Sequence, residues 1–328
     1  MTPSTIARSS FADDVRHYLQ LRPRQLPSQY LYDTLGSALF DAICELPWYR
    51  ITRAESRLLA RHREQIFGHL PGLMNIVELG PGDGRKLRTL VEGTTEPLTA
   101  HLVDVSAGAL ARAAHTLSDA LHIDVVTHEA SFESGLDTIA REIRRSAAAD
   151  ATATGSAGRT LVLFLGSNIG NFDPPASAAL LDRIAAVLQR GDAFLLGADL
   201  VKPERDLLIA YDDPLGVSAA FNLNVLLRIN RELGGNFDLR GFRHRAAWNA
   251  ALSRMEMFAV STRRQHVRIE ALGLQLDLEE REPIWTESSY KYTAEGLIDQ
   301  LENAGFETVA QWIDREDPFA LTLARKRT

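Results

Sequence analysis

The stretch Val-Glu-Leu-Gly-Pro-Gly-Asp-Gly, residues 77–84, decides the fold of this chain. Its first residues end a short apolar segment that is typical of a buried strand, and its glycines open a segment with a helical pattern. Glycines allow a sharp backbone turn, and the start of the following helix offers unpaired N–H groups to a ligand. The spacing G-x-G-x-G differs from the G-x-G-x-x-G of dinucleotide-binding folds. The stretch therefore predicts either a ligand-binding loop or a purely structural turn.

Short apolar segments alternate with helical segments on both sides of this loop. We expect five strands, in NIVELG, AHLVDVS, IDVVTHEASF, TLVLFLGS and AFLLGADLV, separated by helices around 84–93, 106–120, 133–147 and 174–190. Such alternation is typical of a parallel, doubly wound sheet with right-handed crossovers. Near the end of the chain, one more helix precedes two more strands, ETVAQWI and FALTLARK. The pattern predicts an α/β protein with the Rossmann-like, seven-stranded sheet of a class I methyltransferase, its last strand antiparallel.

The chain is expected to have four parts. They are an N-terminal helical segment that contributes to the active site (1–70), the methyltransferase core (71–202), an inserted α+β substrate-binding lobe (203–290), and a helix with two strands that complete the core (291–328). Residues 146–158, SAAADATATGSAG, are small and polar, and we expect a surface loop there.

Composition excludes several classes of protein. The 328 residues carry a net charge of −7, which argues against a nucleic-acid binder. The one cysteine, Cys44, excludes a disulfide framework, and the nine histidines lack the spacing of metal ligands, so we expect no metal. Apolar runs are too short for a membrane helix, and the N-terminus lacks the apolar core of a signal peptide. We therefore expect a cytoplasmic protein with neither membrane nor nucleic-acid partners.

An acidic residue, Asp104, closes the second expected strand. An acid at this point can accept hydrogen bonds from both ribose hydroxyls of S-adenosylmethionine or of NAD. The alternative is a solvated acid that caps the next helix. The two closing strands favour S-adenosylmethionine, and so does Glu78, because this cofactor carries an ammonium and a sulfonium where NAD carries a pyrophosphate.

Two segments are candidates for the acceptor site. In GSNIGNF, after the fourth strand, the carboxamide of Asn171 can donate to a carboxylate and accept from an amine, although Asn168 and Asn171 also suit a loop or a helix cap. In TESSYKY, an expected strand, Glu287 and Ser289 share one face and can hold both nitrogens of an imidazole. The alternative is an edge strand whose polar side faces water.

At these motifs the chain resembles the L-histidine Nα-methyltransferases of ergothioneine biosynthesis, which convert histidine to hercynine. The resemblance covers nearly the whole chain and rests on the combination of VELGPGDGRKLRTLV, LFLGSNIGNF, AYDDPLGVSAAFNLNVLLRINREL, RMEMFAVS and TESSYKY. It implies an enzyme that transfers three methyl groups in succession from S-adenosylmethionine to one nitrogen of L-histidine, and family precedent implies a monomer.

The resemblance also implies a role for individual residues. The cofactor is assigned to Tyr32, Gly80, Lys86, Asp104 and Phe132. The α-amino and carboxylate groups of histidine are assigned to Tyr49, Asn171 and Tyr211, with Gly166 nearby. The imidazole is assigned to Glu287 and Ser289, with Met257 packed against the ring and Phe40 close to the site. No strong general base is evident, so catalysis is expected to rest on orientation and electrostatics.

The chain departs from the family pattern near the adenine and after Tyr49. Ser131 stands where many members have an aspartate, which leaves Glu129 as a candidate acceptor for the adenine amine, and Arg50-Ile51 replaces the usual Tyr-Pro. The alternatives are an N-methyltransferase for another amino acid or an aromatic amine, a cofactor-binding regulator without catalysis, and an NAD-dependent oxidoreductase.

Overall fold

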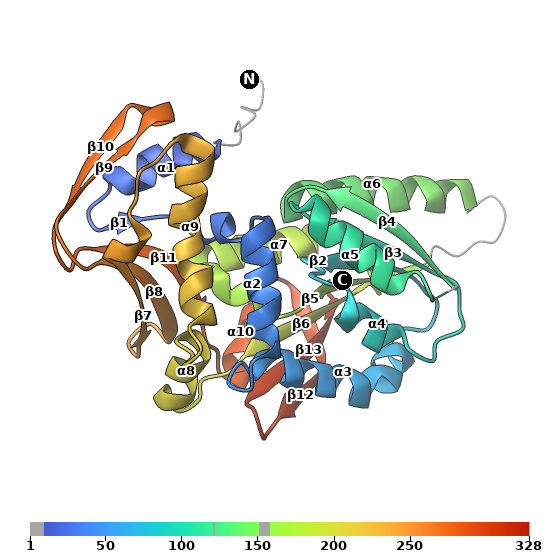
Figure 1. The fold of residues 1–328 in the computed structure, drawn as a ribbon. Helices are drawn as coiled ribbons and strands as arrows, with labels where there is room; N and C mark the ends of the chain where they lie inside the picture. The colour runs from blue at the N-terminus through green and yellow to red at the C-terminus, as the bar shows by residue number, and fades with distance from the viewer. Residues whose placement is uncertain (1–9, 121, 151–157, 328) are drawn as a thin grey trace. The chain divides into compact units, whose positions relative to one another are not determined.

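The computed structural model describes residues 10–120, 122–150 and 158–327, and the chain forms two compact units (Figure 1). Unit 1 comprises Met1–Tyr49 and Pro203–Ser289, and unit 2 comprises Arg50–Lys202 and Tyr290–Thr328. Helix α3 (Ile51–Gly68), part of the expected N-terminal segment, groups with unit 2. Among the described residues, each helix is too short or too polar to cross a bilayer.

Unit 2 is built on a seven-stranded sheet with the order β12-β13-β6-β5-β2-β3-β4. The strands are β2 (Leu73–Leu79), β3 (Leu98–Asp104), β4 (Ile123–Glu129), β5 (Arg159–Phe164), β6 (Ala193–Asp199), β12 (Phe306–Asp314) and β13 (Phe319–Lys326). Strand β13 is antiparallel to both of its neighbours, whereas β6, β5, β2, β3 and β4 run parallel. This topology confirms the predicted class I methyltransferase sheet.

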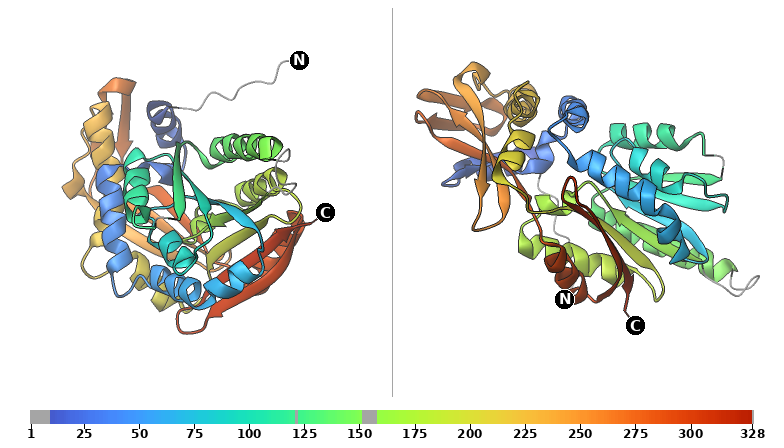
Figure 2. Two further views of the ribbon diagram at one scale, coloured as in Figure 1. Left: turned by 90° about the vertical axis from the view of Figure 1, so that its right-hand side faces the viewer. Right: turned by 90° about the horizontal axis from the view of Figure 1, so that it is seen from below.

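Helices cover both faces of this sheet (Figure 2). On one face α6 (Phe132–Asp150), α7 (Pro174–Val187) and α10 (Ala294–Asn303) share an apolar core with the strands. On the other face α3, α4 (Arg85–Val91) and α5 (Ala107–Leu117) pack against one another. Val77 and Leu79 belong to the first core, so Glu78 between them faces α3 and α4.

The expected loop at residues 146–158 is partly wrong. Helix α6 continues to Asp150, so residues 146–150 are helical, and residues 151–157 lie outside the described part of the chain. The five residues are mostly alanine, the residue with the highest helix propensity, and they extend a helix already formed.

The described residues of unit 1 form a four-stranded sheet of order β1-β11-β8-β7, a hairpin and four α-helices. The strands are β1 (Arg24–Gln25), β7 (Phe242–Asn249), β8 (Arg254–Ser261) and β11 (Pro283–Tyr290), and β9 (Gln265–Ile269) pairs with β10 (Leu274–Leu278). The helices are α1 (Phe11–Gln20), α2 (Thr34–Glu45), α8 (Glu204–Tyr211) and α9 (Val217–Leu233).

Asp33 joins helices α2 and α9 within unit 1. Its carboxylate accepts hydrogen bonds from the N–H of Gly36, the amide of Asn224 and the guanidinium of Arg231, each at 2.7 Å. The first bond caps α2, and the other two come from α9. This contact fixes the chain directly after Tyr32.

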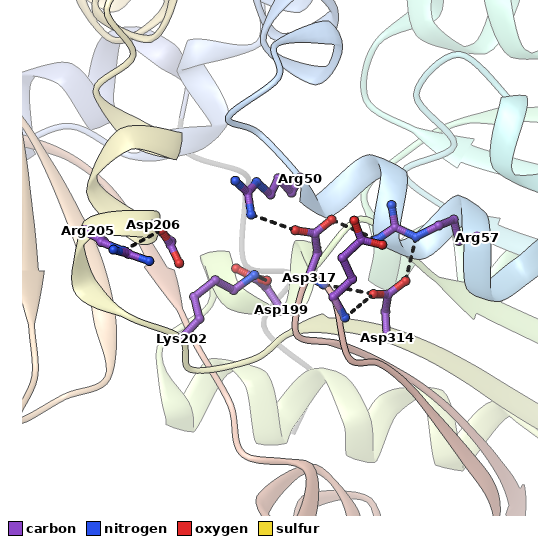
Figure 3. Close-up of polar contacts among 9 residues, drawn as sticks. Arg50, Arg57, Asp199, Lys202, Arg205, Asp206, Asp314 and Asp317 are labelled. Atoms are coloured by element: carbon purple, nitrogen blue, oxygen red, sulfur yellow. Dashed lines mark hydrogen bonds and ion pairs between the residues drawn. The ribbon is translucent and has the colours of Figure 1, made fainter.

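A cluster of ionic contacts in unit 2 connects α3 to the turn between β12 and β13 (Figure 3). The guanidinium of Arg57 lies 2.8 Å from the carboxylates of both Asp314 and Asp317, and Arg50 lies 3.2 Å from Asp317. Burial would raise the pKa of Asp314, but hydrogen bonds from Arg57 and from the Asp317 N–H outweigh it. The pKa of Asp314 is therefore below its usual value.

We expect Asp314→Asn to lower the free energy of unfolding at pH 7 by about 1–3 kcal/mol, because the charge-assisted bonds to Arg57 weaken. A carboxyl whose pKa is lowered on folding stabilises the protein above the unfolded pKa of 3.8, and this contribution disappears as the pH falls through the folded pKa. As the pH falls from 7 to below 4, the free energy of unfolding should therefore decrease less for the variant than for the wild type. Urea denaturation at pH 7 and in acid measures both effects, with the exposed Asp119→Asn as control. Equal acid sensitivity of variant and wild type would contradict the assignment.

Candidate active site

The glycine-rich loop connects β2 to α4 at the carboxyl ends of the parallel strands. Gly80, Gly82 and Gly84 have φ angles of 71°, 59° and 79°, a left-handed region that favours glycine. A Cβ at Gly84 would lie 2.9 Å from the backbone of Ala113, so the loop passes directly over α5. The Gly80 N–H donates to the carbonyl of Val103 at 2.9 Å, which fixes the loop beside the end of β3.

Directly before this loop, Glu78 is buried and only 1% exposed. Its Oε2 atom has no hydrogen-bond partner within the described residues. Burial raises the pKa of Glu78 to about 8, against the opposing effect of the Lys86 ammonium. A buried carboxyl with an unsatisfied oxygen can accept a hydrogen bond from a polar or cationic ligand group.

Asp104 ends β3 on the other side of the loop. Its Oδ1 atom accepts a hydrogen bond from the Ser106 N–H at 2.8 Å, and burial raises the pKa of the carboxyl. The N-cap of α5 is Ser106, whose hydroxyl accepts from the N–H of Ala109. The alternative in which Asp104 caps this helix is therefore wrong.

Phe132, the first residue of α6, lies next to the glycine-rich loop. Its ring packs against Phe164 with the centroids 5.4 Å apart. A Cβ at Gly80 would lie 3.5 Å from the Phe132 ring and 3.0 Å from the Asn168 amide. Gly80, Phe132 and Asn168 therefore come together from three different segments.

The two residues considered for the adenine amine have different surroundings. Ser131 directly precedes α6, and its hydroxyl lies 2.9 Å from the hydroxyl of Ser134 in the first turn of this helix. Glu129 is exposed at the end of β4. Glu129 pairs with Asp104 in the register of β3 and β4. Both residues thus lie at the edge of the loop region.

A buried acid on α3, Glu55, is the main residue that the sequence analysis missed. It is fully buried, and its carboxylate lies 2.7 Å from the Lys86 ammonium. The same carboxylate accepts the Gly166 N–H at 2.8 and 2.9 Å. Glu55 thus holds two residues that were expected at the site, one on α4 and one after β5.

The signal for Glu55 lies in the helical pattern of residues 51–68. Ile51, Leu58 and Leu59 mark the buried side of α3, and Glu55 lies four positions after the first and three before the second. A glutamate on the buried side of a helix is uncommon unless it is paired. An acid on an apolar stripe therefore indicates a buried ion pair.

Close backbone contacts accommodate this ion pair. Gly197 in β6 faces Glu55, because a Cβ at Gly197 would lie 1.9 Å from Glu55 Oε1. Gly166 has a φ of 78°, and a Cβ there would lie 2.7 Å from the Lys86 Nζ atom. Both positions therefore require glycine while Glu55 and Lys86 stay where they are.

Asn171 ends the short 3-10 helix η2 (Asn168–Asn171) after β5 and is half-buried. The segment is held from outside, because the Tyr292 hydroxyl donates to the carbonyl of Ile169 at 3.1 Å. The N-cap of α7 is Asp173, which accepts from the N–H of Ala176 at 2.9 Å. Asn171 is therefore not the cap of this helix.

Unit 1 brings together most of the residues expected to hold the acceptor. The Tyr211 hydroxyl, at the end of α8, donates to the Ser289 hydroxyl on β11 at 2.8 Å. The rings of Tyr49 and Tyr211 lie 6.3 Å apart, edge to face. Met257 on β8 is buried in a small apolar cluster against which Tyr211 packs. Ser289 is 5% exposed, so the alternative in which its side of the strand faces water is wrong.

Glu287 lies two residues before Ser289 on β11 and is half-buried. Its backbone carbonyl accepts the indole N–H of Trp285 at 2.9 Å. Period-two geometry places the Glu287 side chain on the same face of the strand as the buried Ser289.

His244 on β7 supports Tyr211 from behind and was also missed. Its Nε2 atom lies 2.8 Å from the Tyr211 carbonyl and its Nδ1 atom 2.8 Å from the Asn222 amide. Burial lowers the pKa of His244, which favours the neutral form of the ring. The separation of these residues in sequence explains why no local pattern indicated the contact.

Tyr32 belongs to an aromatic cluster in unit 1. Its ring lies 5.4 Å from Phe40 and 5.2 Å from Phe221, and Phe40 lies 6.1 Å from Tyr49. The other residues assigned to the cofactor, Gly80, Lys86, Asp104 and Phe132, all lie in unit 2.

We expect Gly197→Ala to lower the free energy of unfolding by about 1–3 kcal/mol, because the added methyl group overlaps Glu55 and overpacks this site. Urea denaturation followed by circular dichroism measures the change. Gly68→Ala is a matched control, since a Cβ at this helical glycine meets no atom within 4 Å and should be neutral or slightly stabilising. Wild-type stability of Gly197→Ala would contradict the described packing of Glu55.

Comparison with known proteins identifies the family. The family of histidine-specific, S-adenosylmethionine-dependent methyltransferases matches residues 11–326. The histidine N-alpha-methyltransferase of Mycolicibacterium smegmatis is 39% identical over 324 residues, which cover 97% of this chain and 95% of that protein. Its namesake from Mycobacterium tuberculosis is 39% identical over 319 residues, which cover 95% and 94% of the two chains.

A fungal relative is longer. Ergothioneine biosynthesis protein 1 of Neurospora crassa is 26% identical over 307 residues, which cover 88% of this chain but 32% of the fungal protein. The family match confirms the predicted resemblance and the choice of S-adenosylmethionine over NAD. This chain belongs to the family of histidine-specific, S-adenosylmethionine-dependent methyltransferases.

Proposed function

We propose that this enzyme transfers three methyl groups in succession from S-adenosylmethionine to the α-amino group of L-histidine, which gives hercynine, a step toward ergothioneine. The observation that carries the proposal is the hydrogen bond between Tyr211 and Ser289 beside Tyr49 and Met257. Together these residues offer hydroxyl groups and an apolar surface, which suit a small polar substrate with a flat ring.

The surroundings of the glycine-rich loop fit S-adenosylmethionine. The unsatisfied Oε2 atom of Glu78 suits a cofactor that carries an ammonium and a sulfonium, and Asp104 offers carboxylate oxygens for ribose hydroxyls. When bound, S-adenosylmethionine supplies an electrophilic methyl group. We assign its methionyl and ribose end to Gly80, Lys86 and Asp104.

Two aromatic residues complete the proposed set of cofactor contacts. Phe132 beside Gly80 offers a flat apolar surface to an adenine, and Ser131 next to it offers a hydroxyl in place of the usual carboxylate. Tyr32 is proposed to contribute from the aromatic cluster of unit 1.

The acceptor residues have distinct proposed roles. Tyr49, Asn171 and Tyr211 hold the α-amino and carboxylate groups of histidine, with Gly166 nearby. A carboxamide and two phenols can orient an amine lone pair, but they are weak bases at neutral pH. The amine therefore loses its proton to water or along the tyrosines, and rate enhancement comes from holding the nucleophile in line with the methyl group.

Selectivity for histidine is proposed to come from Glu287 and Ser289, which bind the two nitrogens of the imidazole, while Met257 packs against the ring. An acceptor without a second ring nitrogen would not form the hydrogen bond to the Glu287 carboxylate. A hydrogen bond to a charged group contributes roughly 1.5–3 kcal/mol, so such acceptors are disfavoured. We further propose that the enzyme acts in the cytoplasm as a monomer, without nucleic-acid or membrane partners.

We expect Asn171→Ala to lower kcat for histidine methylation by about 100-fold, because the amine is no longer held in line. Binding of S-adenosylmethionine, measured by calorimetry, should change by less than about threefold. The exposed Asn303→Ala is the control. Near-normal turnover of Asn171→Ala would remove this residue from the catalytic set.

We expect Glu287→Gln to raise KM for histidine at least tenfold, about 1.4 kcal/mol, because an amide replaces the charged acceptor at the imidazole. The Kd for S-adenosylmethionine should stay unchanged, and the exposed Glu295→Gln should behave as wild type. Equal losses of both affinities would indicate a structural role for Glu287.

Incubation with each of the twenty amino acids and mass spectrometry of the products tests the choice of acceptor, and a preference for another amino acid would overturn the histidine assignment.

A further inference from the structure

Two histidines and a glutamate come together in unit 2 on the sheet face covered by α6. They are His101 on β3, His128 on β4 and Glu142 on α6, and one ligand atom of each lies within 4.8 Å of the others. The His101 Nδ1 atom lies 3.1 Å from the His128 Nε2 atom, and the two rings are tilted by 30°. The histidines are far apart in the sequence, so no ligand spacing announces the cluster.

The register of β3 and β4 and the position of α6 bring these three residues together. In the parallel register of β3 and β4, Val103 is opposite His128, and His101 lies two residues earlier on the same face. Helix α6 approaches this face closely, because a Cβ at Gly135 would lie 2.4 Å from the Val103 side chain. Glu142 follows Gly135 by about two helical turns, which returns it to the same side of α6.

The chemistry of the three groups suits a transition metal. Burial lowers the pKa of His101 and of His128, which favours the neutral form of both rings. Neutral imidazole is the form that binds metal. Two nitrogens at about 2.0–2.1 Å from one tetrahedral Zn²⁺ lie roughly 3.3 Å apart, close to the separation observed here.

We propose that His101, His128 and Glu142 form a binding site for one divalent transition-metal ion, with Zn²⁺ the best match to two imidazoles and a carboxylate. Binding requires that neither facing nitrogen carries a proton, so each ring takes the tautomer with its proton on the other nitrogen. Rotation of the Glu142 side chain brings its carboxylate to ligand distance, and the fourth position is left for water. The ion would connect β3, β4 and α6, and the proposal does not depend on the assigned methyl transfer.

Titration of the tag-free, EDTA-dialysed protein with ZnCl₂ in a calorimeter tests the site. We expect one equivalent of Zn²⁺ to bind and to raise the thermal unfolding midpoint, because the ion binds the folded state. Mg²⁺ at the same concentration should leave the midpoint unchanged, since it prefers oxygen ligands.

Variants then locate the ion. Glu142→Gln and His128→Gln should each weaken Zn²⁺ binding at least tenfold, and circular dichroism verifies that they fold. His266→Gln, which alters a histidine paired with Asp277 in unit 1, is the control and should bind as wild type. Absence of Zn²⁺ binding to the wild type would overturn the proposal, as would wild-type affinity of both ligand variants.

Discussion

The Glu55 carboxylate is the contact on which the arrangement of unit 2 depends. It is fully buried, and one helix, α3, carries it to both the Lys86 ammonium and the Gly166 N–H. A buried carboxylate that lost its cation would be left with an uncompensated charge, which costs several kcal/mol. The loop after β5 and the first turn of α4 therefore both contact the Glu55 carboxylate. The absence of a side chain at Gly197 in β6 leaves space for this carboxylate, so α3, the loop and the strand constrain one another.

The electrostatics of the loop follow from the same contact. Two buried acids, Glu55 and Glu78, share the field of Lys86. Glu55 makes the ion pair, and burial keeps the pKa of Glu78 high. A cationic ligand beside Glu78 would favour the ionised carboxylate over the neutral carboxyl, which gives the preference for a sulfonium over a pyrophosphate a physical basis. In unit 1, hydrogen bonds between uncharged groups position Tyr211. His244 contacts the backbone carbonyl of Tyr211, and the Tyr211 hydroxyl donates to the Ser289 hydroxyl.

Sequence patterns predicted the architecture well because a parallel sheet imposes them locally. The apolar run of β5 and the G-x-G-x-G turn after β2 each indicate the local structure of their own residues, so the type and order of the elements were predictable. The contacts that join distant segments were not predictable in the same way. Glu55 carried a local signal, an acid on an apolar stripe, whereas His244 and the pair His101–His128 carried none. Strand register brings His101 close to His128, and helices α8 and α9 bring Tyr211 and Asn222 to His244. The loop prediction for residues 146–150 was wrong because it rested on the small size of these residues, whereas their alanines favour helix and extend the preceding helix α6.

The two faces of the central sheet separate two kinds of polar chemistry. Alternation along β2 directs Glu78 towards α3 and α4, and alternation along β3 directs His101 and Val103 towards α6. The acids therefore gather beneath the glycine-rich loop, and the imidazoles gather on the opposite face. Strand β3 belongs to both regions, because it contributes Asp104 at its carboxyl end beside the glycine-rich loop and His101 within its length on the face covered by α6.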